Sequence, residues 1–547
     1  MPEKEFNLLY EPWIMVMCPD GEIEEVSLLE VFHRAPQWRG LAGELPTQDV
    51  AVLRLLLAVL HAVFARYDLE GTLAPISSPD IALQRWKYLW NRESFPMDII
   101  EKYLKHYEDR FYLFHPEYPF YQVPNLDKNK KSANYTVSKM IGEIWQSGSD
   151  PDKPQKVRLF PQRTGNKQRS ICFSEATRWL LHINAFDDVS GSGKGKGETK
   201  RLKYELGWLG QLGLITAVGS NLFETILLNL VFLKDGGNEC WGNEKPVWEE
   251  PVKDNQGISV LLPDNPSELL TFQSRRLLLK CDGDSVTGYY LLGGDYFLKE
   301  NAFAEQMSVW RNAAKDSEQP EYSPRRHDPA RLLWRDFSAL VAQTEGRHRP
   351  GVVSWLSRLK IENVIGKHRF NFQTVAVKYN DTGMKNMVVE DLFSDAISIN
   401  ANLLTALGDD WVNAIINEIE VTEKLVEQVG WLAQKLAKAA GDTDGKGQKN
   451  AAREQAYFRL DIPFRHWLAE TDPERDSINE TCEHWWEQSR GIIRDLGGEL
   501  VYQAGPQAFV GHIIQEKEKG KFIERRYTAS EADNYFQYKI SSREALI

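Results

Sequence analysis

The C-terminal part of the chain contains long amphipathic segments and no strand pattern. From about residue 405 onward, apolar residues recur at helical spacing, as in Trp411, Ile415 and Ile419. Short polar connections divide this part into four segments, at 409–440, 451–470, 477–496 and 499–520. Because short connections force successive helices to run antiparallel, residues 405–547 are predicted to form a four-helix bundle, with the charged tail from residue 521 on its surface.

The preceding 404 residues mix strand and helix patterns. A Pro-Asp-Gly turn at 19–21 between alternating apolar residues predicts a β-hairpin, and the apolar segment 50–67 predicts a buried helix. That segment contains Arg54 and His61 and is too short to span a bilayer. With 547 residues, the chain is too long for one core. We expect an α+β protein, with a mixed α/β N-terminal domain over 1–404 followed by an all-α four-helix bundle over 405–547.

The composition excludes several classes of protein. The net charge of −12 argues against a protein that binds nucleic acid nonspecifically on its own. The five Cys are isolated and form no CxxC pair, which indicates a reducing compartment and no structural zinc site. We therefore expect a soluble cytoplasmic protein that does not associate with membranes.

One positively charged segment stands out from the acidic background. Between residues 153 and 203 there are twelve Lys and Arg against four acidic residues. This segment is rich in Gly, which lets backbone lie close to phosphates that Lys and Arg neutralise. A single apolar helix, predicted at 174–186, separates its two basic loops. The pattern favours local contact with nucleic acid over a solvated loop without function.

No phosphate-binding or phosphohydrolase signature is complete. The segment GSGKGKGET at 191–199 lacks both the second Gly and the Lys-Ser/Thr pair of a phosphate-binding loop. His327-Asp328 has no spaced His and Asp partners, which favours a loop over a metal-dependent active site.

The remaining His-containing motifs also have simpler structural explanations. His115, Glu117 and Tyr118 lie in an extended aromatic stretch whose successive side chains point to opposite faces, which favours a packed corner. His466 and His484 lie beside Trp residues on helical segments, where a structural His is commoner than a metal ligand. We expect no catalytic site, no cofactor and no bound metal.

Two further patterns concern the backbone. Four Gly recur within a short stretch, at Gly207, Gly210, Gly213 and Gly219, which predicts close approach of neighbouring segments. Alternating residues on both sides of Asn380–Gly383 predict an antiparallel hairpin with strands at 372–379 and 384–389.

Taken together, five short stretches and the terminal bundle resemble the CasA family. The stretches lie at 7–16, 115–120, 159–162, 225–230 and 297–300, in the order expected for that family, and they cover most of the chain. CasA is the large subunit of the type I-E CRISPR surveillance complex, Cascade. The resemblance implies a non-catalytic protein that recognises the protospacer-adjacent motif in duplex DNA, promotes opening of the target and recruits the helicase-nuclease. The implied partners are the 5′ handle of the guide RNA, double-stranded target DNA, the backbone and small subunits of Cascade, and the helicase-nuclease.

The resemblance also implies roles for particular residues. The loop that anchors the subunit to the guide handle corresponds to Phe160, Gln162, Arg163, Lys167 and Arg169. The loop that enters the DNA minor groove corresponds to Gly191, Gly193, Lys194, Gly195, Lys196 and Gly197. The family's minor-groove Lys falls at Asn301, so either Asn301 or Lys299 is expected to make that contact. The strand-separating hairpin corresponds to Asn380, Asp381, Thr382 and Gly383, where this chain lacks the family's Gln. At most Cys172 and Cys281 remain of a zinc site that some members carry.

Two alternatives belong to other classes of function. A metal-dependent nuclease requires carboxylates or His clustered at metal-ligand spacing. A purely structural scaffold subunit would retain the bundle but would not depend on Lys194, Lys196 or Lys200 for binding DNA.

Overall fold

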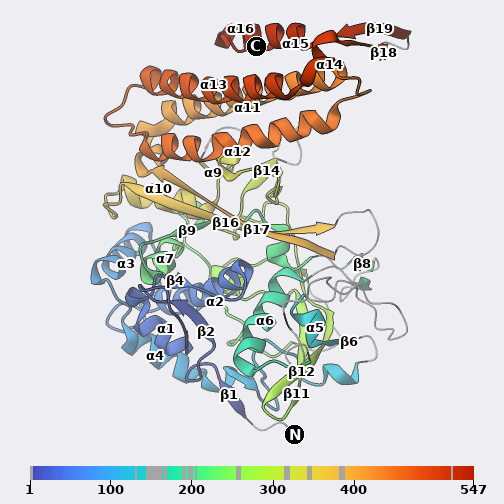
Figure 1. The fold of residues 1–547 in the computed structure, drawn as a ribbon. Helices are drawn as coiled ribbons and strands as arrows, with labels where there is room; N and C mark the ends of the chain where they lie inside the picture. The colour runs from blue at the N-terminus through green and yellow to red at the C-terminus, as the bar shows by residue number, and fades with distance from the viewer. Residues whose placement is uncertain are drawn as a thin grey trace. The chain divides into compact units, whose positions relative to one another are not determined.

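A computed structural model divides the chain into two compact units (Figure 1). It describes residues 4–129, 132–142, 163, 169–187, 192–194, 201–203, 206–253, 260–312, 321–341, 348–380, 388–518 and 521–546. Unit 1 comprises Met1–Arg331 and Ala342–Ala396, and unit 2 comprises Leu332–Val341 and Ile397–Ile547. This division differs from a single boundary at residue 404, because residues 332–341 belong with the helical unit. Trp334 explains the difference: its ring stacks on Phe464 at 4.3 Å and its Nε1 donates to Asp461 Oδ1 at 3.0 Å.

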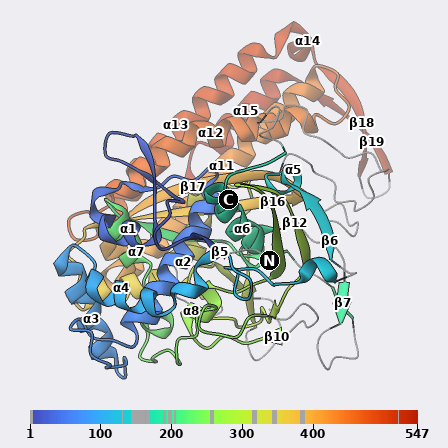
Figure 2. The ribbon, with the colours of Figure 1, turned by 90° about the horizontal axis from the view of Figure 1, so that it is seen from below.

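Helix α2 (Pro46–Phe64) is the central element of unit 1 (Figure 2). It contacts helices α4 (Met97–His106), α6 (Phe173–Phe186), α7 (Leu222–Leu228) and α8 (Pro266–Leu270). The helix is long and apolar enough to cross a bilayer, which corrects the expectation that it is too short, but 94% of its apolar window is buried inside the protein. Burial in the core accounts for its apolar sequence.

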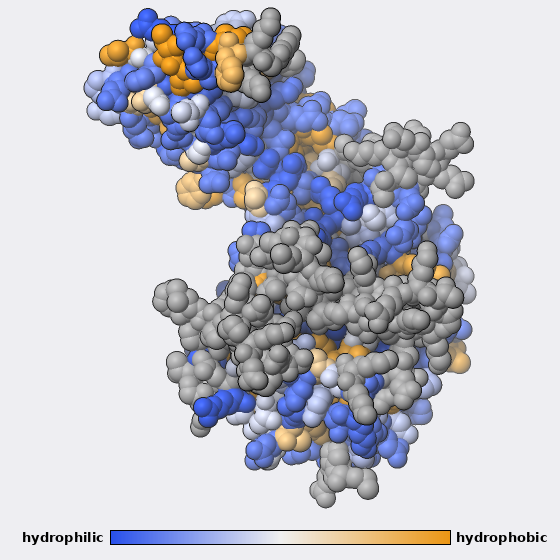
Figure 3. Space-filling view, turned by 90° about the vertical axis from the view of Figure 1, so that its right-hand side faces the viewer, coloured by the Kyte–Doolittle hydropathy of each residue, from blue (hydrophilic) through white to orange (hydrophobic). Residues whose placement is uncertain are grey.

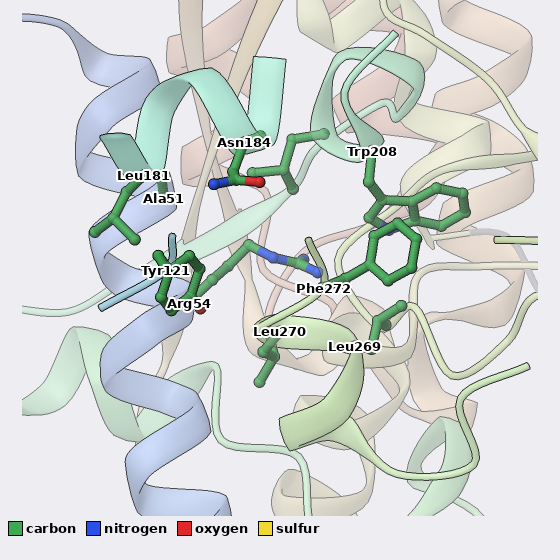
Figure 4. A pocket seen from close by; sticks show the side chains of 11 residues that line it. Ala51, Arg54, Tyr121, Leu181, Asn184, Trp208, Leu269, Leu270 and Phe272 are labelled. Atoms are coloured by element: carbon green, nitrogen blue, oxygen red, sulfur yellow. The ribbon is translucent and has the colours of Figure 1, made fainter. Parts of the chain in front are cut away.

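The buried charge of Arg54 is neutralised inside unit 1. Its guanidinium forms two hydrogen bonds of 2.9 Å with the carboxylate of Glu305, which also accepts from Trp208 Nε1 at 2.8 Å. Arg54 and Trp208 line a small cavity of about 30 Å³ together with Tyr121 and Asn184 (Figure 4). A buried Arg is tolerated in this helix because a carboxylate satisfies it.

Three small sheets are packed around this core. They have the strand orders β3-β2-β4, β11-β12-β6 and β17-β16-β9. The predicted Pro-Asp-Gly hairpin is confirmed, because β2 (Ile14–Met17) pairs antiparallel with β3 (Ile23–Val26) and Gly21 takes a positive φ of 94°. The other strands of these sheets are β4 (Gly40–Leu41), β6 (Ala133–Thr136), β9 (Thr216–Val218), β11 (Arg275–Asp282), β12 (Ser285–Gly293), β16 (Arg369–Asn380) and β17 (Val388–Asn400).

Unit 2 is the predicted helical bundle, with a different fourth helix. Helix α11 (Asp409–Ala439) contacts α12 (Lys446–Glu470), α13 (Ile478–Gln503) and α15 (Ala529–Lys539). The predicted fourth segment, 499–520, instead contains the end of α13, the short helix α14 (Gly505–Val510) and strand β18 (His512–Glu518). The expectation that this part lacks strands is therefore wrong, since β18 pairs with β19 (Lys521–Tyr527). Ile513 and Phe522 on this hairpin are 65% and 74% exposed, and Figure 3 shows apolar surface at this end of unit 2.

The tail from residue 521 is not a surface appendage. Its helix α15 buries Phe536, whose ring packs against Gly497 of α13. A Cβ atom at Gly497 would lie 2.2 Å from Phe536 Cε1. Residues 497–498, predicted to separate the third and fourth segments, therefore lie inside one continuous helix, with Gly497 at a contact site.

Candidate nucleic-acid interface

Helix α6 lies between the two basic loops and is fixed in unit 1 by buried charge. The side chain of Arg178 is 5% exposed, and it contacts Glu25 Oε1 at 2.7 Å and Glu44 Oε1 at 2.5 Å. Burial opposes ionisation of Glu44, but the hydrogen bond and the charge of Arg178 lower its pKa below the ordinary value. Arg178 was counted as part of the basic segment, but it is neutralised within the protein. The charge available to a ligand therefore comes from the loops and not from the helix.

Two short strands are described within the second basic loop, and they form an antiparallel ribbon. Strand β7 (Ser192–Lys194) pairs with β8 (Arg201–Lys203), with Lys194 opposite Arg201, Ser192 opposite Lys203 and Gly193 opposite Leu202. Directly opposed positions share a face of a ribbon, as do positions two apart along one strand. Positions 194, 201 and 203 therefore share one face, and all three are basic. Of the predicted groove-binding residues, Gly191, Gly195, Lys196 and Gly197 lie outside the described residues.

Of the first basic loop, the structure describes Arg163 and the residues from Arg169 onward. Arg163 NH2 lies 2.6 Å from Glu175 Oε1 on α6, which gives this Arg a structural partner. Arg169 is exposed, and it lies two residues before Ile171, whose backbone bridges Val286 of β12 through hydrogen bonds of 2.8 and 3.0 Å. Of the predicted anchoring loop, Arg169 is thus exposed for a ligand, whereas Phe160, Gln162 and Lys167 lie outside the described residues.

Asn301 is held in a tight turn by Tyr322. Its backbone has a positive φ of 52°, a conformation in which Asn is enriched. The backbone amide of Asn301 donates to Tyr322 O at 2.8 Å, and its Oδ1 accepts from the Tyr322 amide at 2.9 Å. Lys299 lies two residues earlier, at a half-buried position. Asn301 therefore shapes the turn that carries Lys299, and its carbonyl oxygen is already used.

The predicted strand-separating hairpin has two paired strands, and both extend beyond the predicted bounds, since β16 runs from Arg369 to Asn380. Strands β16 and β17 are hydrogen-bonded neighbours, and β17 begins at Val388 and runs to Asn400. The alternating pattern predicts an end at residue 389, whereas the strand continues for eleven more residues. Asn380 ends β16, while Asp381, Thr382 and Gly383 lie outside the described residues.

One hydrogen bond connects this hairpin to helix α6. Tyr379 Oη, one residue before the predicted tip, donates to Phe186 O at the end of α6 at 2.6 Å, and Tyr379 is only 5% exposed. Gly210 lies against it, since a Cβ there would approach Tyr379 Oη to 2.2 Å. This contact confirms the predicted close approach at Gly210. A Cβ at Gly207 would similarly lie 2.3 Å from Ala185 O. The Gly pattern could be read from the sequence, but nothing in the sequence pointed to Tyr379 as the partner.

Two of the His-containing motifs have hydrogen-bond partners within the protein. His115 Nδ1 accepts from the amides of Glu117 and Tyr118 at 3.0 and 2.8 Å, and burial lowers its pKa. Buried His327 contacts Leu214 O at 3.1 Å. Within the described ranges, no three His, Cys, Asp or Glu side chains are grouped as metal ligands.

Comparison with known proteins identifies the family. A family model described as CRISPR-associated protein Cse1 matches residues 7–496. The chain belongs to the Cse1 family. The resemblance to CasA is thereby confirmed, since the two names are joined in a curated relative, the CRISPR-associated protein CasA/Cse1 of Thermus thermophilus, which is 28% identical over 94% of this chain and 98% of its own length.

Solved Cse1 structures share the fold. The crystal structure of Thermobifida fusca Cse1 matches with a TM-score of 0.80 and 32% identity over 99% of this chain and 98% of its own. A chain of a structure named CRISPR RNA-guided surveillance complex matches with a TM-score of 0.60 at 16% identity, over 92% of this chain and 99% of its own, and shows likeness of fold alone. The predicted α+β class with C-terminal helices is therefore that of the Cse1 fold.

Proposed function

We propose that this Cse1 chain is the large, non-catalytic subunit of a cytoplasmic type I-E CRISPR surveillance complex. Within that complex it binds the 5′ handle of the guide RNA, the backbone subunits and the small subunits. In this role it recognises a short motif in double-stranded DNA through the minor groove, promotes opening of the duplex and recruits the helicase-nuclease. Membership of the Cse1 family and the likeness of fold to a chain of a surveillance complex support the assembly part of the proposal.

The β7–β8 ribbon is the observation that carries the DNA-binding part. Lys194 opposite Arg201 places like charges in direct register, which destabilises a ribbon unless an anion compensates. A duplex supplies that anion on both sides of its narrow minor groove, and the adjoining Gly-rich backbone can enter where side chains would collide. Main-chain groups there distinguish A·T from G·C pairs only loosely, so the motif preference should be relaxed.

Lys299 is the better candidate than Asn301 for the second groove contact. The side-chain oxygen of Asn301 accepts from the Tyr322 amide and its backbone amide donates to Tyr322 O, so Asn301 is fixed in its turn. A Lys ammonium on a long stem has the charge and the length to contact a phosphate or a base-edge acceptor. We therefore assign the contact to Lys299 and the shape of its turn to Asn301.

The test replaces Gly193 and Gly195 by Leu in the assembled, guide-loaded complex. Motif-dependent binding to duplex DNA should be lost, because the added side chains obstruct the groove. Gly366→Leu is the matched control, since Gly366 is exposed and a Cβ there meets no atom within 4 Å. Retention of motif-dependent binding by the double variant, measured by electrophoretic mobility shift, would refute the groove assignment.

Two further experiments distinguish the proposed function from the nuclease and scaffold hypotheses. The nuclease hypothesis expects manganese-dependent cleavage of DNA or RNA by the purified chain. The scaffold hypothesis expects normal assembly and unchanged duplex binding when Lys194 and Lys196 are replaced by Gln.

A further inference from the structure

A hollow of about 590 Å³ lies between the end of helix α12 and the start of α13 in unit 2. Its volume is in the range of pockets that hold small molecules or anchoring side chains. Its floor includes Trp467, which is buried and donates from Nε1 to Thr481 O at 3.1 Å. Behind Trp467, Phe464 and Trp485 pack at 5.3 and 5.5 Å between ring centroids, so the floor is rigid.

The apolar rim continues along the outer face of α12. Ile462 lines the hollow and is 76% exposed, and Phe458, one helical turn earlier, is 83% exposed. Residues four apart lie on one face of a helix, so the two form a continuous stripe that ends in the hollow. Two large apolar side chains exposed side by side are typical of an interaction surface.

The charged side chains that line the hollow are acidic apart from two His, and His466 Nδ1 lies 3.0 Å from Glu470 Oε2. Glu470, Asp476 and Glu480 line it, and its lining contains neither Lys nor Arg. Over residues 466–488 there are seven carboxylates and one guanidinium, that of Arg475, which lies 3.5 Å from Asp472. This charge repels nucleic acid and attracts cations, so the surface differs in kind from the β7–β8 ribbon.

We propose that the α12–α13 hollow binds a basic segment of another protein chain, with one large apolar side chain of that segment seated on Trp467 and Ile462. Lys or Arg on either side of the anchor would neutralise Glu470, Asp476 and Glu480. Burial of an aromatic anchor in a rigid pocket with an oppositely charged rim is the usual arrangement of an interaction hot spot.

The test uses the full-length protein and a fluorescein-labelled probe peptide with the sequence Gly-Lys-Arg-Trp-Leu-Lys-Arg-Gly. Fluorescence anisotropy should show saturable binding. A peptide with Ser in place of Trp and Leu keeps the charge, and a peptide with Gln in place of every Lys and Arg keeps the anchor. Each control peptide should bind at least about tenfold more weakly, because neither the basic charge nor the apolar anchor is sufficient by itself.

Variants of the protein locate the site. Glu470→Gln combined with Glu480→Gln, and separately Ile462→Ser, should weaken probe binding by about tenfold. Glu474→Gln and Phe522→Ser are matched controls, since both residues are exposed but do not line the hollow, and each should leave affinity within about twofold of the wild type.

Several outcomes would overturn the proposal. If the peptide with Ser in place of Trp and Leu binds as tightly as the probe, the hollow is only a nonspecific acidic surface. Equal losses in the lining and control variants would place the probe elsewhere. Displacement of the probe by micromolar zinc chloride but not by unlabelled peptide would identify a metal site formed with His466 and His484. Even if a variant fails to fold, the affinities of the wild-type protein for the three peptides test whether binding requires both charge and anchor.

Discussion

At the scale of single residues, unit 1 contains a buried acid and a buried base that face each other without a hydrogen bond. His61 Nδ1 and Glu244 Oε1 are 3.8 Å apart, and within the described structure neither atom has a partner. Burial raises the pKa of Glu244 to about 7 and lowers the pKa of His61 to about 3. Both groups are therefore held toward their neutral forms, as expected where water is excluded.

This pair predicts a pH-dependent stability. The pKa of Glu244 is higher in the folded than in the unfolded chain, so its favourable contribution is complete below about pH 4.5 and is lost as pH rises through about 7. Glu244→Gln, which stays neutral, should therefore match the wild type near pH 4 and exceed it by about 3 kcal/mol near pH 8. Burial lowers the pKa of His61, and Glu244→Gln keeps that burial, so the comparison reports on Glu244.

Denaturant unfolding at both pH values measures the effect, and Glu239→Gln is the control, because that side chain is 78% exposed. A constant difference between Glu244→Gln and the wild type across this range would contradict the assigned shift.

At the scale of elements, helix α13 runs through two consecutive Gly that differ in their surroundings. Phe536 of α15 fills the space beside Gly497, whereas a Cβ at Gly498 meets nothing within 4 Å. The helix continues through both because packing against α11, α12 and α15 outweighs the low helix propensity of Gly.

The two Gly predict opposite effects of one substitution. Gly498→Ala should stabilise the protein by about 0.5–1 kcal/mol, because Ala is the better helix former. Gly497→Ala should destabilise it by about 1–3 kcal/mol through overpacking against Phe536. Thermal melting followed by far-ultraviolet circular dichroism gives both values, and shifts of the same sign would argue against the α13–α15 contact.

The β16–β17 hairpin is the other element with a testable role. We predict that shortening residues 380–383 to a two-residue turn leaves binding to the motif unchanged but slows formation of the R-loop. The shorter tip would fill less of the space that is left when a base pair unstacks. A fluorescent base beside the motif reports the rate in the assembled complex.

The control for this prediction is the DNA. A target already opened next to the motif should restore the rate for the shortened hairpin. If the intact duplex gives unchanged kinetics, the hairpin has no strand-separating role.

At the scale of the whole molecule, a net charge of −12 is combined with a local cluster of basic residues. Such a chain should bind DNA tightly only within an assembly that supplies further positive charge or guide pairing. The contribution of the β7–β8 ribbon should therefore be measurable as a change in the salt dependence of DNA binding, although the net charge of the chain gives no sign of it.

Replacing Lys194, Arg201 and Lys203 by Gln should reduce the slope of log K against log salt concentration by about 2 to 3 in the assembled complex, since about 0.9 counterions are released per phosphate contact. A charge-matched control replaces Lys87, Lys102 and Lys424, which are exposed elsewhere. An equal change of slope in both would mean that the ribbon makes no local phosphate contacts.

Local patterns in the sequence determined the bundle helices, the buried α2, the β2–β3 hairpin and the close approach at Gly207 and Gly210. Helical period, alternation and Gly spacing are properties of neighbouring residues, so they can be read before the fold is known. Tertiary structure alone decided that Trp334 joins unit 2, that α15 replaces the expected fourth segment, and that Tyr379 reaches Phe186. Each of these depends on packing between residues far apart in the chain. Arg178 illustrates the limit: its charge is visible in the sequence, but its neutralisation by Glu25 and Glu44 depends on contacts across more than a hundred residues.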